Sequence, residues 1–162
     1  MYKLHLDREI SKELFEGVPK EVRDWVVNAI ANIVIVDGII EEHEFVALQE
    51  AIGLLDNKEE IHDMMKKVKE RNLVKVGKII MEQELAIKVF FYLAAIAVID
   101  GNLKKSEKEL LNECGICLGL ETVLIRAVTS WSLKQMEINR KLSHELKGSN
   151  KDRKRIIDSL LS

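Results

Sequence analysis

Residues 95–107 read Ala-Ile-Ala-Val-Ile-Asp-Gly-Asn-Leu-Lys-Lys-Ser-Glu, and residues 31–44 read Ala-Asn-Ile-Val-Ile-Val-Asp-Gly-Ile-Ile-Glu-Glu-His-Glu. In both stretches an apolar run ends at Asp-Gly, and a glutamate follows the aspartate seven residues later. An apolar run that ends at a glycine able to adopt the left-handed conformation is typical of a helix terminus. The two stretches therefore predict two helix–turn–helix units.

The two units form an internal repeat. Residues 28–55 align without a gap to residues 91–118, at an offset of 63 residues. Identical pairs include Ala31/Ala94, Ile33/Ile96, Asp37/Asp100, Gly38/Gly101, Glu44/Glu107, Leu48/Leu111 and Glu50/Glu113. Because most of the polar identities fall at the junction between helices, we expect two helix pairs related by an approximate two-fold axis.

Apolar residues recur at helical spacing along the rest of the chain and predict an all-α fold. The expected helices cover residues 7–16, 19–37, 41–55, 57–71, 73–81, 82–99, 104–118 and 121–146. Pro19 suits a first helical position, and Asn57 with Glu60 suits a capping pair. In the third and last helices the residues expected to be buried are Phe45, Leu48, Ile52 and Leu55, and Leu124, Ile125, Val128, Trp131, Leu133, Met136 and Leu142.

The chain is expected to form one domain over residues 1–147, with repeat halves at about 19–72 and 82–146. Residues 148–162 then form a basic amphipathic tail. Between Lys134 and Asp158 there are eight basic and four acidic residues, a net charge of +4. This segment is either a solvated helix end or a docking segment for an acidic partner or a membrane surface.

Composition excludes several classes of protein. The 162 residues are 47% hydrophobic and carry a formal net charge of −2, which argues against a dedicated nucleic-acid binder. The longest uncharged stretches, Trp25–Val36 and Val89–Ile99, are too short to span a membrane, and the chain start has no apolar signal region. Two cysteines without a disulfide framework favour a reducing, cytoplasmic setting.

The repeated turn invites comparison with a calcium-binding EF-hand loop. Its Asp-Gly and its glutamate match positions 5, 6 and 12 of that loop. Positions 1 and 3 would be Ile33 and Ile35 in the first unit, and Ile96 and Val98 in the second. These side chains cannot bind a metal, so the turn is not an EF-hand.

Two interpretations of the acidic turns remain open. Glu44 and Glu107 are expected near the third position of a helix, where a carboxylate caps free N–H groups and meets the positive end of the dipole. Asp37 and Asp100 each follow a helix, at its negative end, where a carboxylate is unfavourable. Either bonds to the following loop amides or a bound cation would compensate for this placement.

Other candidate motifs have simpler explanations. The pair Cys114 and Cys117 has the Cys-x-x-Cys spacing, but it lies late in a helix and no second ligand pair for zinc exists. These positions align with Ala51 and Leu54, so both cysteines are expected to be buried and apolar in character. The four histidines form no His-Glu-x-x-His pattern, and no phosphate loop or nucleophile elbow is present.

An apolar helix that ends in Asp-Gly-x-[Ile/Leu]-x-x-x-Glu, repeated in one chain of this length, resembles the TerB-like family. The closer copy is residues 95–107 and the looser copy is residues 31–44, and the resemblance covers about residues 19–146. It implies a bundle of about seven helices with pseudo-two-fold symmetry. The family is associated with bacterial tellurite resistance and stress responses, and its domain also occurs in a membrane-anchored J-domain co-chaperone.

The resemblance also implies a divalent metal, for which the matching ligands are Asp37, Glu44, Asp100 and Glu107. Calcium suits these oxygen donors best, although its six to eight ligands would require both turns to converge. Many relatives carry additional acidic residues at the second turn. This chain has Lys104 and Lys105 there, and they would oppose cation binding.

The sequence thus favours a non-enzymatic stress-response module that binds protein partners and a divalent cation. The second hypothesis is a structural interaction domain in which both acidic turns only cap helices. The third is a metal-dependent hydrolase, which is weak because no general base or nucleophile accompanies the acidic cluster.

Overall fold

The structure is a computed structural model, and it describes residues 17–36, 42–53, 55, 57–72, 75–98, 103–146, 154–155 and 158. These residues contain six long α-helices and no β-strand, which confirms the all-α prediction. The helices are α1 (Lys20–Ile35), α2 (Glu42–Ile52), α3 (Lys58–Glu70), α4 (Gln83–Ala97), α5 (Lys105–Cys117) and α6 (Thr122–Leu146). The helix predicted over residues 7–16, and most of the tail, lie outside the described residues, so the expected count of seven is not tested.

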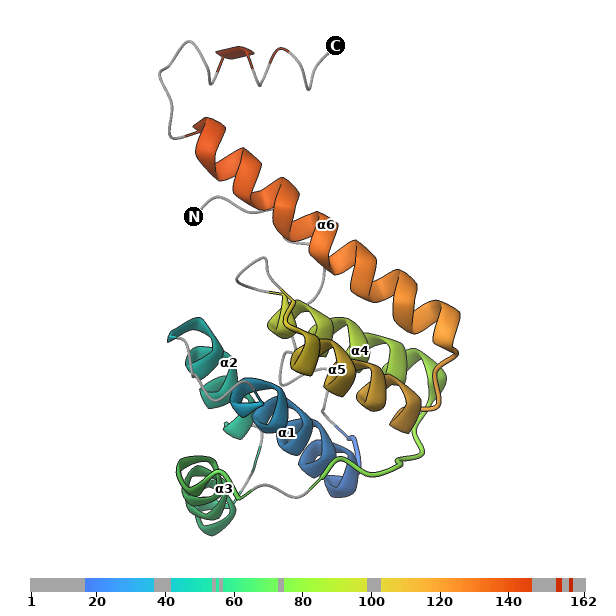
Figure 1. The fold of residues 1–162 in the computed structure, drawn as a ribbon. Coiled ribbons are helices and arrows are strands. Elements are labelled where there is room, and N and C mark those ends of the chain that lie inside the picture. Colours follow the sequence, from blue (N-terminus) through green and yellow to red (C-terminus); the bar gives the residue numbers. More distant parts are fainter. Residues whose placement is uncertain are drawn as a thin grey trace.

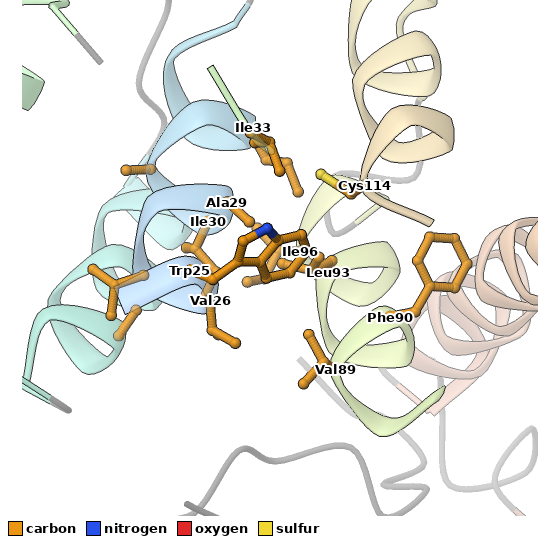
Figure 2. Close-up of a cluster of buried hydrophobic side chains, with 14 of the residues drawn as sticks. Trp25, Val26, Ala29, Ile30, Ile33, Val89, Phe90, Leu93, Ile96 and Cys114 are labelled. Carbon is orange, nitrogen blue, oxygen red and sulfur yellow. The ribbon is translucent and has the colours of Figure 1, made fainter. Parts of the chain in front are cut away.

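Helices α1 and α4 form the centre of the molecule (Figure 1). They pack against each other, α2 packs on α1, and α5 packs on α4. Figure 2 shows Val26 and Ile30 of α1 on the side that faces Leu93 of α4, while Phe90 lies on the other side of α4; all four are fully buried. Burial of these side chains supplies the main driving force for folding.

The helix boundaries follow the offset of the sequence repeat. Helices α1 and α4 begin 63 residues apart, at Lys20 and Gln83. Helices α2 and α5 also begin 63 residues apart, at Glu42 and Lys105. Each of the four helices begins one residue after its predicted start at residue 19, 41, 82 or 104.

The third helices, α3 and α6, differ from each other. Helix α3 has 13 residues, and its buried residue is Val68. Its N-cap is Asn57, whose side chain accepts a hydrogen bond of 2.9 Å from the N–H of Glu59, as the capping prediction requires. Glu60 does not complete a capping pair but forms an ion pair with Lys20 of α1. Helix α6 has 25 residues and packs on both α4 and α5 (Figure 1).

Helix α6 approaches α5 closely at Gly115. A Cβ atom added to Gly115 would lie 2.6 Å from Cγ1 and Cδ1 of Ile125 and 3.2 Å from Cε2 of Phe90. Glycine is therefore required for this contact. Between the two helices the chain turns at Gly119, whose φ of 79° lies in the left-handed region, as the predicted break at this residue requires.

The prediction of a short helix over residues 73–81 is wrong. In the described part of this segment, residues 75–81, the chain has no helical structure. Its backbone groups bond to other elements instead: the Gly77 carbonyl accepts a 2.7 Å bond from Nε1 of Trp25, and the Ile79 N–H donates to the Cys117 carbonyl at 3.1 Å. These tertiary partners replace the bonds that a helix would provide. We call residues 75–82 the connector.

Two residues predicted to be buried are exposed. Trp131 is 62% exposed and Phe45 is 38% exposed. The buried face of α6 is formed by Ile125, Val128, Thr129, Ser132, Met136 and Asn139. Half of these residues are polar, so a search for apolar side chains could not identify Thr129, Ser132 and Asn139 as buried. Met136, Ile125 and Val128 were predicted correctly.

The structure also bears on the membrane prediction. Within the described ranges, no helix is both long enough and apolar enough to cross a membrane.

Candidate functional site

The structure tests the acidic turns only in part. Asp37 and Asp100 lie outside the described residues, as does the side chain of Glu44. The backbone places Glu44 third in α2 and Glu107 third in α5. The predicted helical position of both glutamates is therefore confirmed. Whether the four carboxylates converge stays a prediction.

Glu107 is the member of this set whose side chain is described. Only 3% of its surface is exposed, and it lies in the first turn of α5. Lys104 is the N-cap residue of that helix and makes no side-chain cap bond. A buried carboxylate at the third position faces the free N–H groups and the positive end of the helix dipole.

The two lysines of the second turn are exposed. Lys105 lies 3.9 Å from the carboxylate of Glu109, one helical turn further along α5. Among the residues that the structure describes, no group of three or more His, Cys, Asp or Glu side chains is arranged to hold a metal ion.

A second candidate site was not predicted. A hollow of about 520 Å³ lies between α1, α3 and the connector. Ligand pockets in proteins commonly have volumes of roughly 300–1,000 Å³. Its apolar lining comes from all three segments and from the chain before α3: Trp25, Leu55, Met64 and Ile79.

The charged lining of the hollow is divided between its walls. Four carboxylates come from α1 and the earlier turns of α3: Glu21, Asp24, Glu60 and Asp63. Three lysines come from the later part of α3 and from the connector: Lys67, Lys75 and Lys78. We call these four carboxylates the acidic wall and the three lysines the basic wall.

Asp24 is the electrostatically perturbed group of the acidic wall. Partial burial raises the pKa of its carboxyl, and the nearby charge of Glu60 raises this pKa further. Lys20 forms an ion pair with Glu60 and acts in the opposite direction on Asp24. Arg23 also lowers the pKa of Asp24, but burial and Glu60 outweigh both cations.

The sequence contains a pattern that could have indicated the two helix faces that line the hollow. Glu21, Asp24, Trp25 and Asn28 are spaced to share one face of α1, and Glu60, Asp63, Met64 and Lys67 share one face of α3. Each face mixes charges with large apolar side chains. What the sequence did not reveal is the non-helical connector that brings the two faces together.

The cysteines follow the prediction closely. Both are free thiols; Cys114 is fully buried, and Cys117 is half-buried, with its sulfur 3.8 Å from the Val76 carbonyl. Burial raises the pKa of Cys114 to about 12, and the neighbouring Cys117 and Glu113 act in the same direction. A thiol that stays protonated is a poor nucleophile and a poor metal ligand, so Cys114 is a core residue.

Comparison with models of known protein families, with curated proteins and with solved structures gives no match to this chain. The resemblance to the TerB-like family therefore rests on the repeated Asp-Gly turn.

Proposed function

We propose that this chain is a non-enzymatic, TerB-like stress-response module of the cytoplasm that binds protein partners and is controlled by a divalent cation. The observation that carries the proposal is the equivalent placement of Glu44 and Glu107, each third in a helix, with the two helices starting 63 residues apart. In this proposal the two halves are related by a pseudo-two-fold axis that passes close to both turns.

The ligands would be Asp37, Glu44, Asp100 and Glu107, and the cation would be calcium. Calcium binds carboxylate oxygens at about 2.3–2.6 Å, so both turns must lie within a few ångströms of one ion. The burial of Glu107 supports the proposal, because a carboxylate removed from water gains more from a nearby cation than an exposed one does. The basic residues beyond Lys134 would contact an acidic partner protein or a membrane surface.

A specific observation also favours the capping alternative. Glu107 lies in the first helical turn, and the N-cap residue Lys104 makes no side-chain cap bond. In this alternative Glu107 supplies the missing cap, Asp100 bonds to loop amides, and the domain is a scaffold that binds no ion.

Calcium titration of the wild type and of the Asp100→Asn variant distinguishes the metal-binding proposal from the capping alternative. If the turns converge, calcium raises the melting temperature of the wild type, and calorimetry measures the binding directly. Asp100→Asn abolishes that rise and stabilises the calcium-free protein, because it removes one of several repelling charges. Glu121→Gln, at an exposed position outside both turns, is the control and keeps the calcium response.

The capping alternative makes the opposite prediction. Calcium then changes nothing, and Asp100→Asn lowers the melting temperature modestly because a weaker acceptor faces the loop amides. Magnesium in parallel tests the identity of the ion, because its smaller octahedral shell suits a flexible carboxylate site less well.

A further inference from the structure

We propose that the hollow between α1, α3 and the connector is a binding site for a short apolar peptide that has a free amino group and a free carboxylate. This site is separate from the acidic turns and does not depend on cation binding there.

The shape and floor of the hollow indicate an organic ligand. Its volume of about 520 Å³ far exceeds what one ion requires. Trp25, Leu55, Met64 and Ile79 supply apolar surface for side chains of the ligand. Pockets that bind small molecules combine such a surface with a few polar groups that fix the orientation of the ligand.

The charges of the walls indicate a ligand with two opposite charges. Asp24 and Asp63 lie on the acidic wall, and Lys75 and Lys78 lie on the connector. Among the described residues, neither Asp63 nor Lys78 has an ion-pair partner. A ligand amino group beside Asp24 and Asp63, with its carboxylate beside the connector lysines, would pair with both walls. A purely cationic or purely anionic ligand would satisfy one wall and be repelled by the other.

The raised pKa of Asp24 supports this orientation. Partial burial and the charge of Glu60 make the carboxylate of Asp24 costly in the free protein. An ammonium group placed next to it would relieve that cost and lower the pKa.

The hollow is held in shape by the protein itself. Trp25 of α1 donates a 2.7 Å hydrogen bond to the Gly77 carbonyl, which fixes the connector against α1. The Ile79 N–H donates to the carbonyl of Cys117, which fixes the same connector against α5. A binding site whose walls are ordered before the ligand arrives loses less conformational entropy on binding.

Trp25 also provides the measurement. The chain has two tryptophans, and Trp131 lies on α6 with 62% of its surface exposed. In the Trp131→Phe variant, fluorescence reports on Trp25 alone.

The probes are the dipeptide leucyl-phenylalanine, its C-terminal amide and its N-acetyl derivative. We expect the free dipeptide to change the Trp25 emission with a saturable dependence on concentration, and each blocked form to bind at least about tenfold more weakly.

Substitutions on the two walls assign the orientation. Asp24→Asn should weaken binding of the free dipeptide about tenfold but leave the weaker binding of the N-acetyl derivative unchanged. Lys78→Gln should weaken the free dipeptide similarly and leave the amide unchanged. Glu70→Gln and Lys69→Gln alter exposed charges of α3 that do not line the hollow, and they are the matched controls.

Several results would overturn the proposal. One is a lack of any saturable change with the free dipeptide at millimolar concentration, checked by calorimetry on the wild type. Another is equal binding of all three probes, which would mean that the charged walls play no part. A third is loss of binding in the two control variants. Circular dichroism of each variant identifies any change that results from misfolding. A failed calcium titration would leave this result unaffected.

Discussion

The two halves of the molecule share a helix pair but differ in how the third helix covers it. In the second half, α6 packs on α4 and α5, and Ile125 fills the space that a side chain at residue 115 would need. In the first half, α3 stands over one side of α1 and leaves a hollow of about 520 Å³. One helix pair is therefore covered closely by a third helix, and the other has an open hollow beside it.

Aligned positions explain the difference. Gly115 aligns with Ile52, a buried isoleucine, so α2 has no equivalent small residue at which a third helix could approach closely. Asp24, Trp25 and Asn28 face the hollow from α1. On α4 the aligned residues are Ile87, Lys88 and Phe91, of which the isoleucine and phenylalanine pack against the core. Divergence at a few such positions is enough to convert a packed interface into a cavity.

The largest expected effect is at the closed interface. Gly115→Val should lower the free energy of unfolding by about 2–3 kcal/mol, because Ile125 is itself buried and has little room to move. Urea denaturation measures the loss, and Asn112→Val, at an exposed position of α5, is the control.

A double-mutant cycle sharpens this result. Ile125→Ala in the Gly115→Val background should recover part of the lost stability, because it removes the atoms that the valine contacts. Fully additive effects of the two substitutions would show that α5 and α6 do not meet as described.

The next prediction compares the stability cost of replacing Trp25, which lines the hollow, with that of replacing Trp131, which lies on the surface of α6. Trp25→Phe should cost about 1–2 kcal/mol, because it removes the hydrogen bond to Gly77 and some buried surface. Trp131→Phe should change stability by less than about 0.5 kcal/mol, since Trp131 is largely exposed. Thermal or urea unfolding of both variants measures the two losses of stability. Equal losses would contradict the burial of Trp25 and the exposure of Trp131.

The pH dependence of stability distinguishes Cys114 from Ala51, the residue that aligns with it. The pKa of Cys114 is about 12 in the folded protein, against 9.0 for an ordinary thiol. The unfolded chain therefore loses this proton first as pH rises above 9, and the stability that comes from the protonated thiol is lost between pH 9 and 12. At pH 10 this loss is on the order of 1 kcal/mol.

Cys114→Ala makes the second half resemble the first and removes that loss. Unfolding of both proteins at pH 7 and pH 10 is compared, because other groups also titrate in this range. If the difference in stability between wild type and variant is the same at both pH values, Cys114 does not have the raised pKa.

The smallest effect is expected at the start of α3. Asn57→Ala removes the acceptor of the 2.9 Å bond from the Glu59 N–H and should cost about 1 kcal/mol. Amide hydrogen exchange should show that the loss is concentrated in α3. Lys66→Ala, in the exposed middle of the helix, is the matched control, and an equal loss there would argue against the capping role.

Most of the helices were predictable because their apolar spacing and end signals agree. Pro19, Asn57 and Gly119 each mark a boundary that the structure places within a few residues. The burial of Cys114 was predictable from its alignment with Ala51. At these positions the local sequence is sufficient to predict where a helix begins or ends and which residue is buried.

The connector and the inner face of α6 were not predictable in this way. Residues 75–82 have enough apolar residues for a helix, but their hydrogen bonds go to Trp25 and Cys117, which are distant in sequence. On α6, Ser132 and Asn139 are buried while Trp131 is exposed, which reverses the usual preference of each side chain. The hollow depends on the connector, so it could not be predicted either.

The connector has a consequence for the way the chain unfolds. It is the covalent link between the two halves, and it is bonded to α1 on one side and to the end of α5 on the other. Separation of the halves would break both bonds and expose the apolar surfaces of α1 and α4 together. We therefore expect a single cooperative transition, in which amides of α1 and α4 exchange with solvent at the same free energy despite lying more than 50 residues apart.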